Sequence, residues 1–234
     1  MFIRFPIGVF FTFLLFNASL AQNDGHARKV REYAELHSRL RELEREILRP
    51  TNAEIGTAAE QGLNAIRLMP REKYEHGLTI RGGGAYYSFH RLTHEYNYGS
   101  DIELQQGSLS VGFAGADYGL LYDLGERDLS AVERGLPEVR FLVKYEPPSD
   151  EPSIRIEQRR SNNYEADGFV YKSRVPALVG HAYILRSINF SNSDILIAFR
   201  VVRKDADGSL IIFWKPIESF KKPELARNAA AETQ

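Results

Sequence analysis

Residues 180–214, GHAYILRSINFSNSDILIAFRVVRKDADGSLIIFW, predict the centre of the fold. Three segments rich in β-branched and aromatic residues, at 180–188, 195–203 and 210–214, are separated by the polar links NFSNSD and DADG. Such segments form strands that pair through their turns, so we expect an antiparallel three-stranded meander. The middle segment is apolar on both faces and should lie inside the sheet. Lys215-Pro216 should end the last strand.

Upstream segments predict more sheet. Ile102 and Leu104 alternate with polar residues, Gln106-Gly107 provides a turn, and residues 109–113 alternate again. This pattern predicts a hairpin with one apolar and one wet face. Other expected elements are strands at 118–124, 139–145, 154–158 and 169–173, a short helical turn within 127–135, and an exposed loop at 161–168.

The N-terminal part predicts a helical hairpin. Apolar residues recur at steps of three and four from residue 27 to 49, and Pro50 should end that helix. Thr51 and Glu54 have the spacing of a capping box, which begins a second helix running to about residue 64. The stripe of the first helix can pack on its own domain or serve as a coiled-coil seam. It consists of Val30, Tyr33, Leu36, Leu40, Leu43 and Ile47.

The first 21 residues resemble a secretory leader. Arg4 gives the positive start, residues 5–16 the apolar segment, and Ser19-Leu20-Ala21 the cleavage signal. The apolar run is shorter than the ~20 residues that span a bilayer, so no stable membrane span is expected after cleavage; retention as an anchor is the alternative. The chain has no cysteine, which excludes disulfides and thiol chemistry and suits a periplasmic or secreted bacterial protein.

These observations predict an α+β protein in which an N-terminal helical hairpin packs on an antiparallel β-sheet, either a sandwich or a partial barrel. We expect a signal peptide at 1–21, a helical hairpin and linker at 22–78, an antiparallel β domain at 79–222 and a frayed tail at 223–234. With 30 basic and 31 acidic residues the formal net charge is −1, so no nucleic-acid partner is expected.

Residues 81–104 gather aromatic, histidine and carboxylate side chains behind a Gly82-Gly83-Gly84 turn. Aromatic side chains give stacking area to a ligand, or they pack in the core. The candidate ligand-binding residues are Tyr86, Tyr87, His90, His94, Tyr96 and Tyr98.

The same stretch contains weaker candidates for metal binding and catalysis. His90 and His94 share one face of a helix, but on a strand they lie ~13 Å apart, so we expect no metal site and no cofactor. Glu95, Asp101 and Glu103 are candidate catalytic acids and bases, and the last two, ~6–8 Å apart on one strand face, fit an inverting glycosidase. Alternating charges on a solvated strand are the other interpretation.

Residues 82–124, beginning GGGAYYSFHRLTHEYNYG, and residues 180–214 resemble a group of uncharacterised exported bacterial proteins. The resemblance implies export and carries over no activity, ligand or catalytic residue.

We therefore expect a non-enzymatic binding or structural module of the bacterial envelope or secretome. Its partner would be an envelope protein, a glycan or a small molecule held by the aromatic residues between 83 and 98. The alternative is a hydrolase, possibly glycan-directed, that uses the carboxylates and histidines of residues 90–103. Oligomerisation through the first helix is a third possibility.

Overall fold

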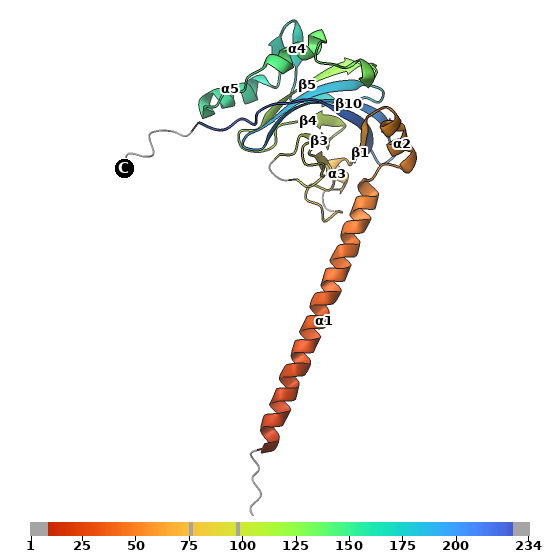
Figure 1. Cartoon of the computed structure of the whole chain (residues 1–234), viewed down its shortest axis with the longest axis vertical. Coiled ribbons are helices and arrows are strands. Elements are labelled where there is room, and N and C mark those ends of the chain that lie inside the picture. The colour runs from red at the N-terminus through yellow and green to blue at the C-terminus, as the bar shows by residue number, and fades with distance from the viewer. Residues whose placement is uncertain (1–8, 75–76, 97–98, 227–234) are drawn as a thin grey trace, which may run out of the picture. The chain divides into compact units, whose positions relative to one another are not determined.

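The computed structural model describes residues 9–74, 77–96 and 99–226, with side chains from Gly25 onward (Figure 1). Residues 1–8 of the predicted leader, Tyr98, and residues 227–234 of the predicted tail lie outside this part. The chain divides into two compact units between Ile47 and Leu48.

The described residues of the first unit lie in the helix α1 (Val9–Leu48), whose last residue belongs to the second unit. It confirms the helix predicted from residue 27, and it ends just before Pro50. The six apolar side chains of its predicted stripe are between 39% and 69% exposed. None of the helices in the described part is long and apolar enough to cross a membrane.

The second unit is built on two antiparallel sheets and a small hairpin. The five-stranded sheet has the order β1 (Asn64–Leu68), β11 (Leu210–Ser219), β10 (Ser193–Lys204), β9 (Ala182–Asn189), β5 (Tyr118–Gly125). The four-stranded sheet has the order β2 (Tyr86–Tyr87), β3 (Ile102–Gln105), β4 (Ser108–Ser110), β8 (Arg174–Pro176). The hairpin pairs β6 (Tyr164–Ala166) with β7 (Phe169–Tyr171).

Both faces of the five-stranded sheet are covered. On one face Leu185 and Phe199 pack in a core that includes Ile102 and Leu109 of the four-stranded sheet. On the other face the core includes side chains of α2 (Asn52–Glu60), α4 (Pro137–Lys144) and α5 (Glu151–Arg160). Figure 1 shows α4 and α5 on one side of the five-stranded sheet and β3 and β4 on the other. The α+β class is confirmed, and the sheets form layers rather than a closed barrel.

The C-terminal meander is confirmed, with β10 in the middle of the sheet. The predicted end at Lys215-Pro216 is wrong, because β11 continues to Ser219. Pro216 lies opposite Ile197, beside a register shift at Leu196 and Ile197. A bulge of this kind accommodates a proline because the ladder there lacks one regular hydrogen bond.

Two segments predicted as strands are helices. Residues 139–145 lie largely in α4, where Leu136 is the extended N-cap and Pro137 opens the first turn. Residues 154–158 lie in α5, where the Asp150 side chain accepts a hydrogen bond from Ser153 N at 2.9 Å. Proline in the first turn and a capping aspartate favour helices, and these signals outweigh two or three alternating apolar residues.

The start of the β region also differs from the prediction. The strand β1 lies within the range expected to hold only helices and a linker. It follows α2, which begins at the predicted capping box, and both are confirmed.

The element α3 (Arg71–Tyr74) and the turn η1 (Leu129–Ala131) complete the described elements. The latter confirms the helical turn predicted within 127–135. Part of the loop predicted at 161–168 is β6.

Candidate functional site

A pocket of about 360 Å³ lies where α3, the glycine turn and the start of the four-stranded sheet meet. Three of the residues that line it, Tyr86, Tyr96 and Glu103, were predicted from the sequence as site residues. The described residues that line it are Arg71, Arg81, Gly82, Tyr86, Tyr96, Glu103 and Phe113. We call this group the Arg81 pocket.

The glycine turn gives the pocket its shape. Gly82, Gly83 and Gly84 have φ values of +84°, +61° and +77°, a left-handed run that side chains with a Cβ rarely adopt. A Cβ on Gly82 would lie 2.5 Å from Cδ2 of Tyr86. The missing side chain therefore lets the Tyr86 ring lie directly against the turn, and the predicted turn is confirmed.

Aromatic rings form one wall. The ring centroids of Tyr86 and Tyr96 are 4.4 Å apart, and Phe113 meets Tyr86 edge to face at 5.1 Å. The Tyr96 hydroxyl donates to the Phe113 carbonyl at 3.2 Å, and Tyr96 N donates to the Arg81 carbonyl at 3.1 Å. These contacts hold the three rings against one another and form one side of the pocket.

Two arginines line the pocket in different states. Nη1 of Arg71 is 3.0 Å from Oε1 of Glu103, and its guanidinium lies 5.7 Å from the Tyr86 ring centroid. The Arg81 guanidinium lies 5.0 Å from the Tyr96 ring centroid, and no carboxylate of the described residues pairs with it. Arg81 therefore presents a positive charge that an anionic ligand can pair with.

Glu103 is only 4% exposed, so the hairpin does not have the wet face that the alternating charges predicted. Three side chains donate hydrogen bonds to its carboxylate. They are Arg71, the Ser110 hydroxyl at 3.1 Å from Oε2, and the Tyr86 hydroxyl. Burial raises the pKa of Tyr86, and the hydrogen bond to Glu103 adds to the shift. Tyr86 is therefore a neutral phenol that donates to a carboxylate at physiological pH.

Asp101 is fully buried away from this pocket. Its carboxylate accepts hydrogen bonds from Phe89 N at 2.7 Å, Ser187 Oγ at 2.6 Å and Asn189 Nδ2 at 2.8 Å, with Ser88 Oγ at 3.3 Å. Burial raises the pKa of Asp101, against the effect of these hydrogen bonds. The residue joins the two sheets and does not face a ligand.

The other predicted residues that the structure describes do not line the Arg81 pocket. His94 Nε2 lies 2.6 Å from the Arg67 carbonyl, and its ring meets the buried Tyr87 edge to face at 4.9 Å. Burial lowers the pKa of His94 to about 4, although the hydrogen bond opposes the shift. His90 and Glu95 are exposed. Among the described residues, no three His, Asp or Glu side chains gather closely enough to hold a metal ion.

Sequence reasoning missed Arg71, Arg81 and Phe113 as site residues. Arg81 was within reach of prediction, because it directly precedes the glycine turn. Arg71 and Phe113 come from other elements, and nothing in their neighbouring residues indicates that they meet Tyr86. The pocket depends on tertiary contacts that the local pattern does not contain.

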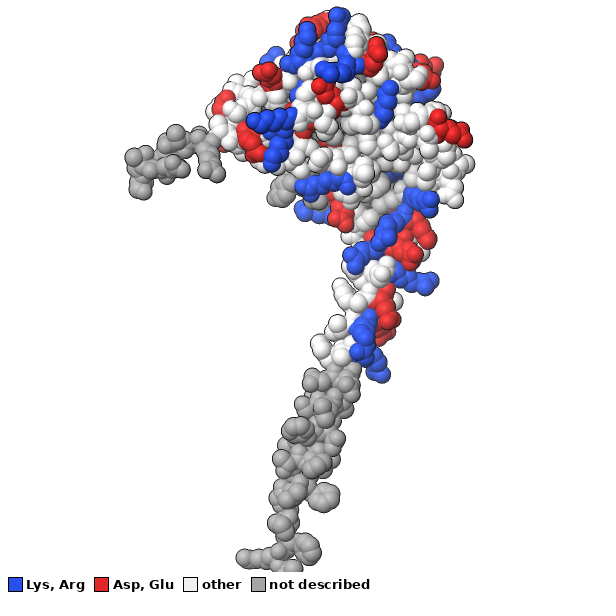
Figure 2. Space-filling view, in the orientation of Figure 1, with Lys and Arg blue, Asp and Glu red and all other residues white. Residues whose placement is uncertain are grey.

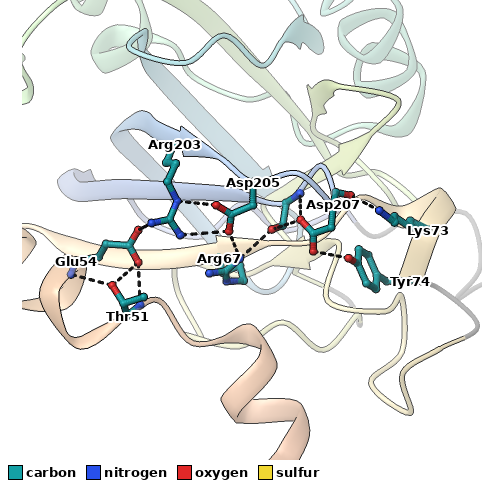
Figure 3. Close-up of polar contacts among 9 residues, drawn as sticks. Thr51, Glu54, Arg67, Lys73, Tyr74, Arg203, Asp205 and Asp207 are labelled. Carbon is teal, nitrogen blue, oxygen red and sulfur yellow. Dashed lines mark hydrogen bonds and ion pairs between the residues drawn. The ribbon is translucent and has the colours of Figure 1, made fainter.

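A second polar cluster lies at the tip of the β10–β11 hairpin (Figure 3). Arg203 pairs with Glu54 at 2.5 Å and with Asp205 at 2.6 Å, and Arg67 pairs with Asp205 at 2.5 Å. Asp207 accepts hydrogen bonds from Tyr74 and from Ser209. Although burial opposes them, these hydrogen bonds lower the pKa of Asp207 to about 2. The carboxylates are already paired, so the cluster ties α2, β1 and α3 to the hairpin.

The face seen in Figure 2 carries interspersed Lys, Arg, Asp and Glu side chains on both units, without a large patch of one sign.

No protein-family model, no curated protein and no solved structure is significantly similar to this chain.

Proposed function

We propose that this protein is an exported, non-enzymatic binding module that holds a small ligand or a glycan unit in the Arg81 pocket. The observation that carries the proposal is the Arg81 guanidinium, which lies 5.0 Å from the Tyr96 ring centroid beside an aromatic wall and has no carboxylate partner among the described residues. Pockets that combine an apolar wall with a few fixed polar groups are typical of small-molecule sites.

Binding can be tested by titrating the ¹⁵N-labelled full chain with a mixture of neutral and anionic ring compounds at millimolar concentrations. We expect the backbone amides of Arg81, Tyr86, Tyr96 and Glu103 to shift together. Arg140→Gln on the exposed face of α4 should leave the shifts unchanged, whereas Arg81→Gln should reduce them. A mixture that moves none of these amides would overturn the proposal.

The hydrolase alternative needs two carboxylates that face one substrate. Of its three candidates only Glu103 lines the Arg81 pocket, since Asp101 is held between the sheets and Glu95 is exposed. Glu103 is also held by Arg71, Ser110 and Tyr86, which suits a structural or binding role. The geometry therefore favours binding over acid–base chemistry at these residues.

A second candidate function is assembly through α1. Its apolar stripe has residues spaced three and four apart, as in a coiled-coil seam. Each of these side chains is at least 39% exposed: Tyr33, Leu36, Leu40, Leu43 and Ile47. In sedimentation experiments the full chain should show concentration-dependent association, which the double change Leu36→Glu and Leu43→Glu abolishes. A chain that sediments as a monomer at every concentration would exclude this function.

Export itself is a proposal that rests on the leader-like first 21 residues. Expression of the full chain in a bacterium should give a protein in the periplasm or medium that begins at Gln22, as determined by its mass. A cytoplasmic protein with an intact N-terminus would contradict the proposal.

A further inference from the structure

We infer that the Arg81 pocket selects a hydroxylated ring that carries a single carboxylate, the chemistry of a hexuronic acid. This inference deepens the proposed binding function and rests on it. It follows from the charges, the geometry of Arg81 and the free capacity of Glu103.

The charged side chains of the pocket match a monoanion. Among the lining residues that the structure describes, Arg71 and Arg81 bring two positive charges and Glu103 brings one negative charge, a net charge of +1. Since Arg71 is held against Glu103 at 3.0 Å, the charge that remains is located at Arg81. One carboxylate neutralises it. A phosphate, with a charge of about −1.5 to −2 at pH 7, would leave excess negative charge beside buried Glu103.

The position of Arg81 favours a carboxylate. Its guanidinium lies 5.0 Å from the ring centroid of Tyr96, and the side chain is exposed. No carboxylate of the described residues pairs with its N–H groups, which a ligand can therefore contact. A carboxylate fits the edge of a guanidinium through two parallel hydrogen bonds, which a neutral hydroxyl cannot provide.

Glu103 can accept from a ring hydroxyl as well. A carboxylate has about four sites for hydrogen bonds. Arg71, Ser110 and Tyr86 donate to it, and a further hydrogen bond from a ring hydroxyl is within its capacity. A ligand that has a carboxylate for Arg81 and a hydroxyl for Glu103 therefore satisfies both polar groups.

The size of the pocket agrees with a small saccharide. Its volume of about 360 Å³ is at the lower end of the range for small-molecule sites, about 300–1,000 Å³. The rings of Tyr86, Tyr96 and Phe113 supply the apolar wall against which the C–H face of a sugar can pack.

The test is a calorimetric and NMR titration of the full chain with three probes of similar size: D-glucuronate, D-glucose and D-glucose 6-phosphate. We expect D-glucuronate to bind roughly tenfold or more tightly than either other sugar. Arg81→Gln should remove the preference for D-glucuronate over D-glucose. The control Arg140→Gln should keep it, and an unchanged melting temperature of both variants shows that they fold.

This experiment distinguishes a failure of carboxylate selection from a failure of the proposed binding function. Equal binding of D-glucose and D-glucuronate, or tighter binding of the phosphate, overturns carboxylate selection and leaves a binding pocket. If none of the three sugars binds but another ring compound shifts the pocket amides, the saccharide class is wrong. If no compound shifts those amides, both proposals fall.

Discussion

Ser187 on β9 donates a hydrogen bond to the carboxylate of Asp101, and this 2.6 Å contact joins the five-stranded sheet to the residue that precedes β3. Asn189 and the Phe89 amide donate to the same carboxylate. We expect Asp101→Asn to lower the free energy of unfolding by about 2–4 kcal/mol. The asparagine side chain replaces one acceptor oxygen by an NH2 group, which would face buried groups that are themselves donors. Urea denaturation measures the loss. Glu95→Gln at an exposed position is the control, and an equal effect of the two changes would contradict this role for Asp101.

His94 should make the protein less stable in mild acid. Its pKa of about 4 in the folded state lies below the unfolded value of 6.5, so the unfolded chain binds the extra proton first. The stabilisation is present above pH 6.5 and is lost as the pH falls toward 4, by about 1–3 kcal/mol. Urea denaturation between pH 7 and 4 should show a weaker pH dependence in His94→Gln. The exposed His90→Gln should keep the wild-type dependence, and a wild-type slope in His94→Gln would refute the prediction.

Asp117 should have the opposite dependence. Burial raises its pKa to about 6, although Phe190 N donates to it at 2.9 Å. The folded protein retains a proton that the unfolded chain loses, so this contribution is complete below pH 3.8 and is lost as the pH rises through 6. We expect Asp117→Asn, whose amide oxygen can still accept from Phe190, to stabilise the protein at pH 7.5 by about 1–2 kcal/mol. Glu165→Gln on an exposed strand is the control, and destabilisation by Asp117→Asn would show that its ionised form is favoured.

Gly82 should tolerate alanine less well than Gly107 does. Both have positive φ, but a Cβ on Gly82 meets Tyr86 at 2.5 Å whereas a Cβ on Gly107 has no neighbour within 4 Å. Gly107→Ala should cost about 1 kcal/mol for backbone strain, and Gly82→Ala about 2–3 kcal/mol because the ring must also move. Thermal unfolding compares the two. Equal losses of stability in the two variants would mean that the Tyr86 ring moves away from the new Cβ at little energetic cost, which would contradict a fixed wall of the Arg81 pocket.

The sequence predicted the parts of the fold that long, regular patterns define. The meander of β9, β10 and β11, the helix from residue 27 and the hairpin at Gln106-Gly107 all follow from hydrophobic period and turn residues. The alternation of apolar residues at 139, 141, 143 and 145 predicted a strand, whereas the residues that the helix buries are Val139 and Leu142, which are three apart. In that segment Pro137 was the better signal.

The candidate site was predicted only in part, for a physical reason. Tyr86, Tyr96 and Glu103 lie within one stretch of sequence, and their residue types indicate binding. Their burial and pairing depend on Arg71 and Phe113, which come from other elements. In the same way, the sequence alone suggests that Asp101 lies on the solvent-exposed face of a strand, whereas its contact with Ser187 of β9 shows that it is buried. Local alternation cannot reveal such partners.

The first strand of the five-stranded sheet, β1, pairs with the last strand in sequence, β11. Asn64 at one end of β1 lies opposite Trp214 of β11, and Leu68 at the other end lies opposite Leu210, so almost the whole domain separates the two partners in sequence. A growing chain cannot complete this sheet until β11 has been synthesised, which makes formation of the sheet a late and comparatively slow event. A polypeptide cut short before β11 would leave the edges of β1 and β10 without a partner and open to pairing with another molecule.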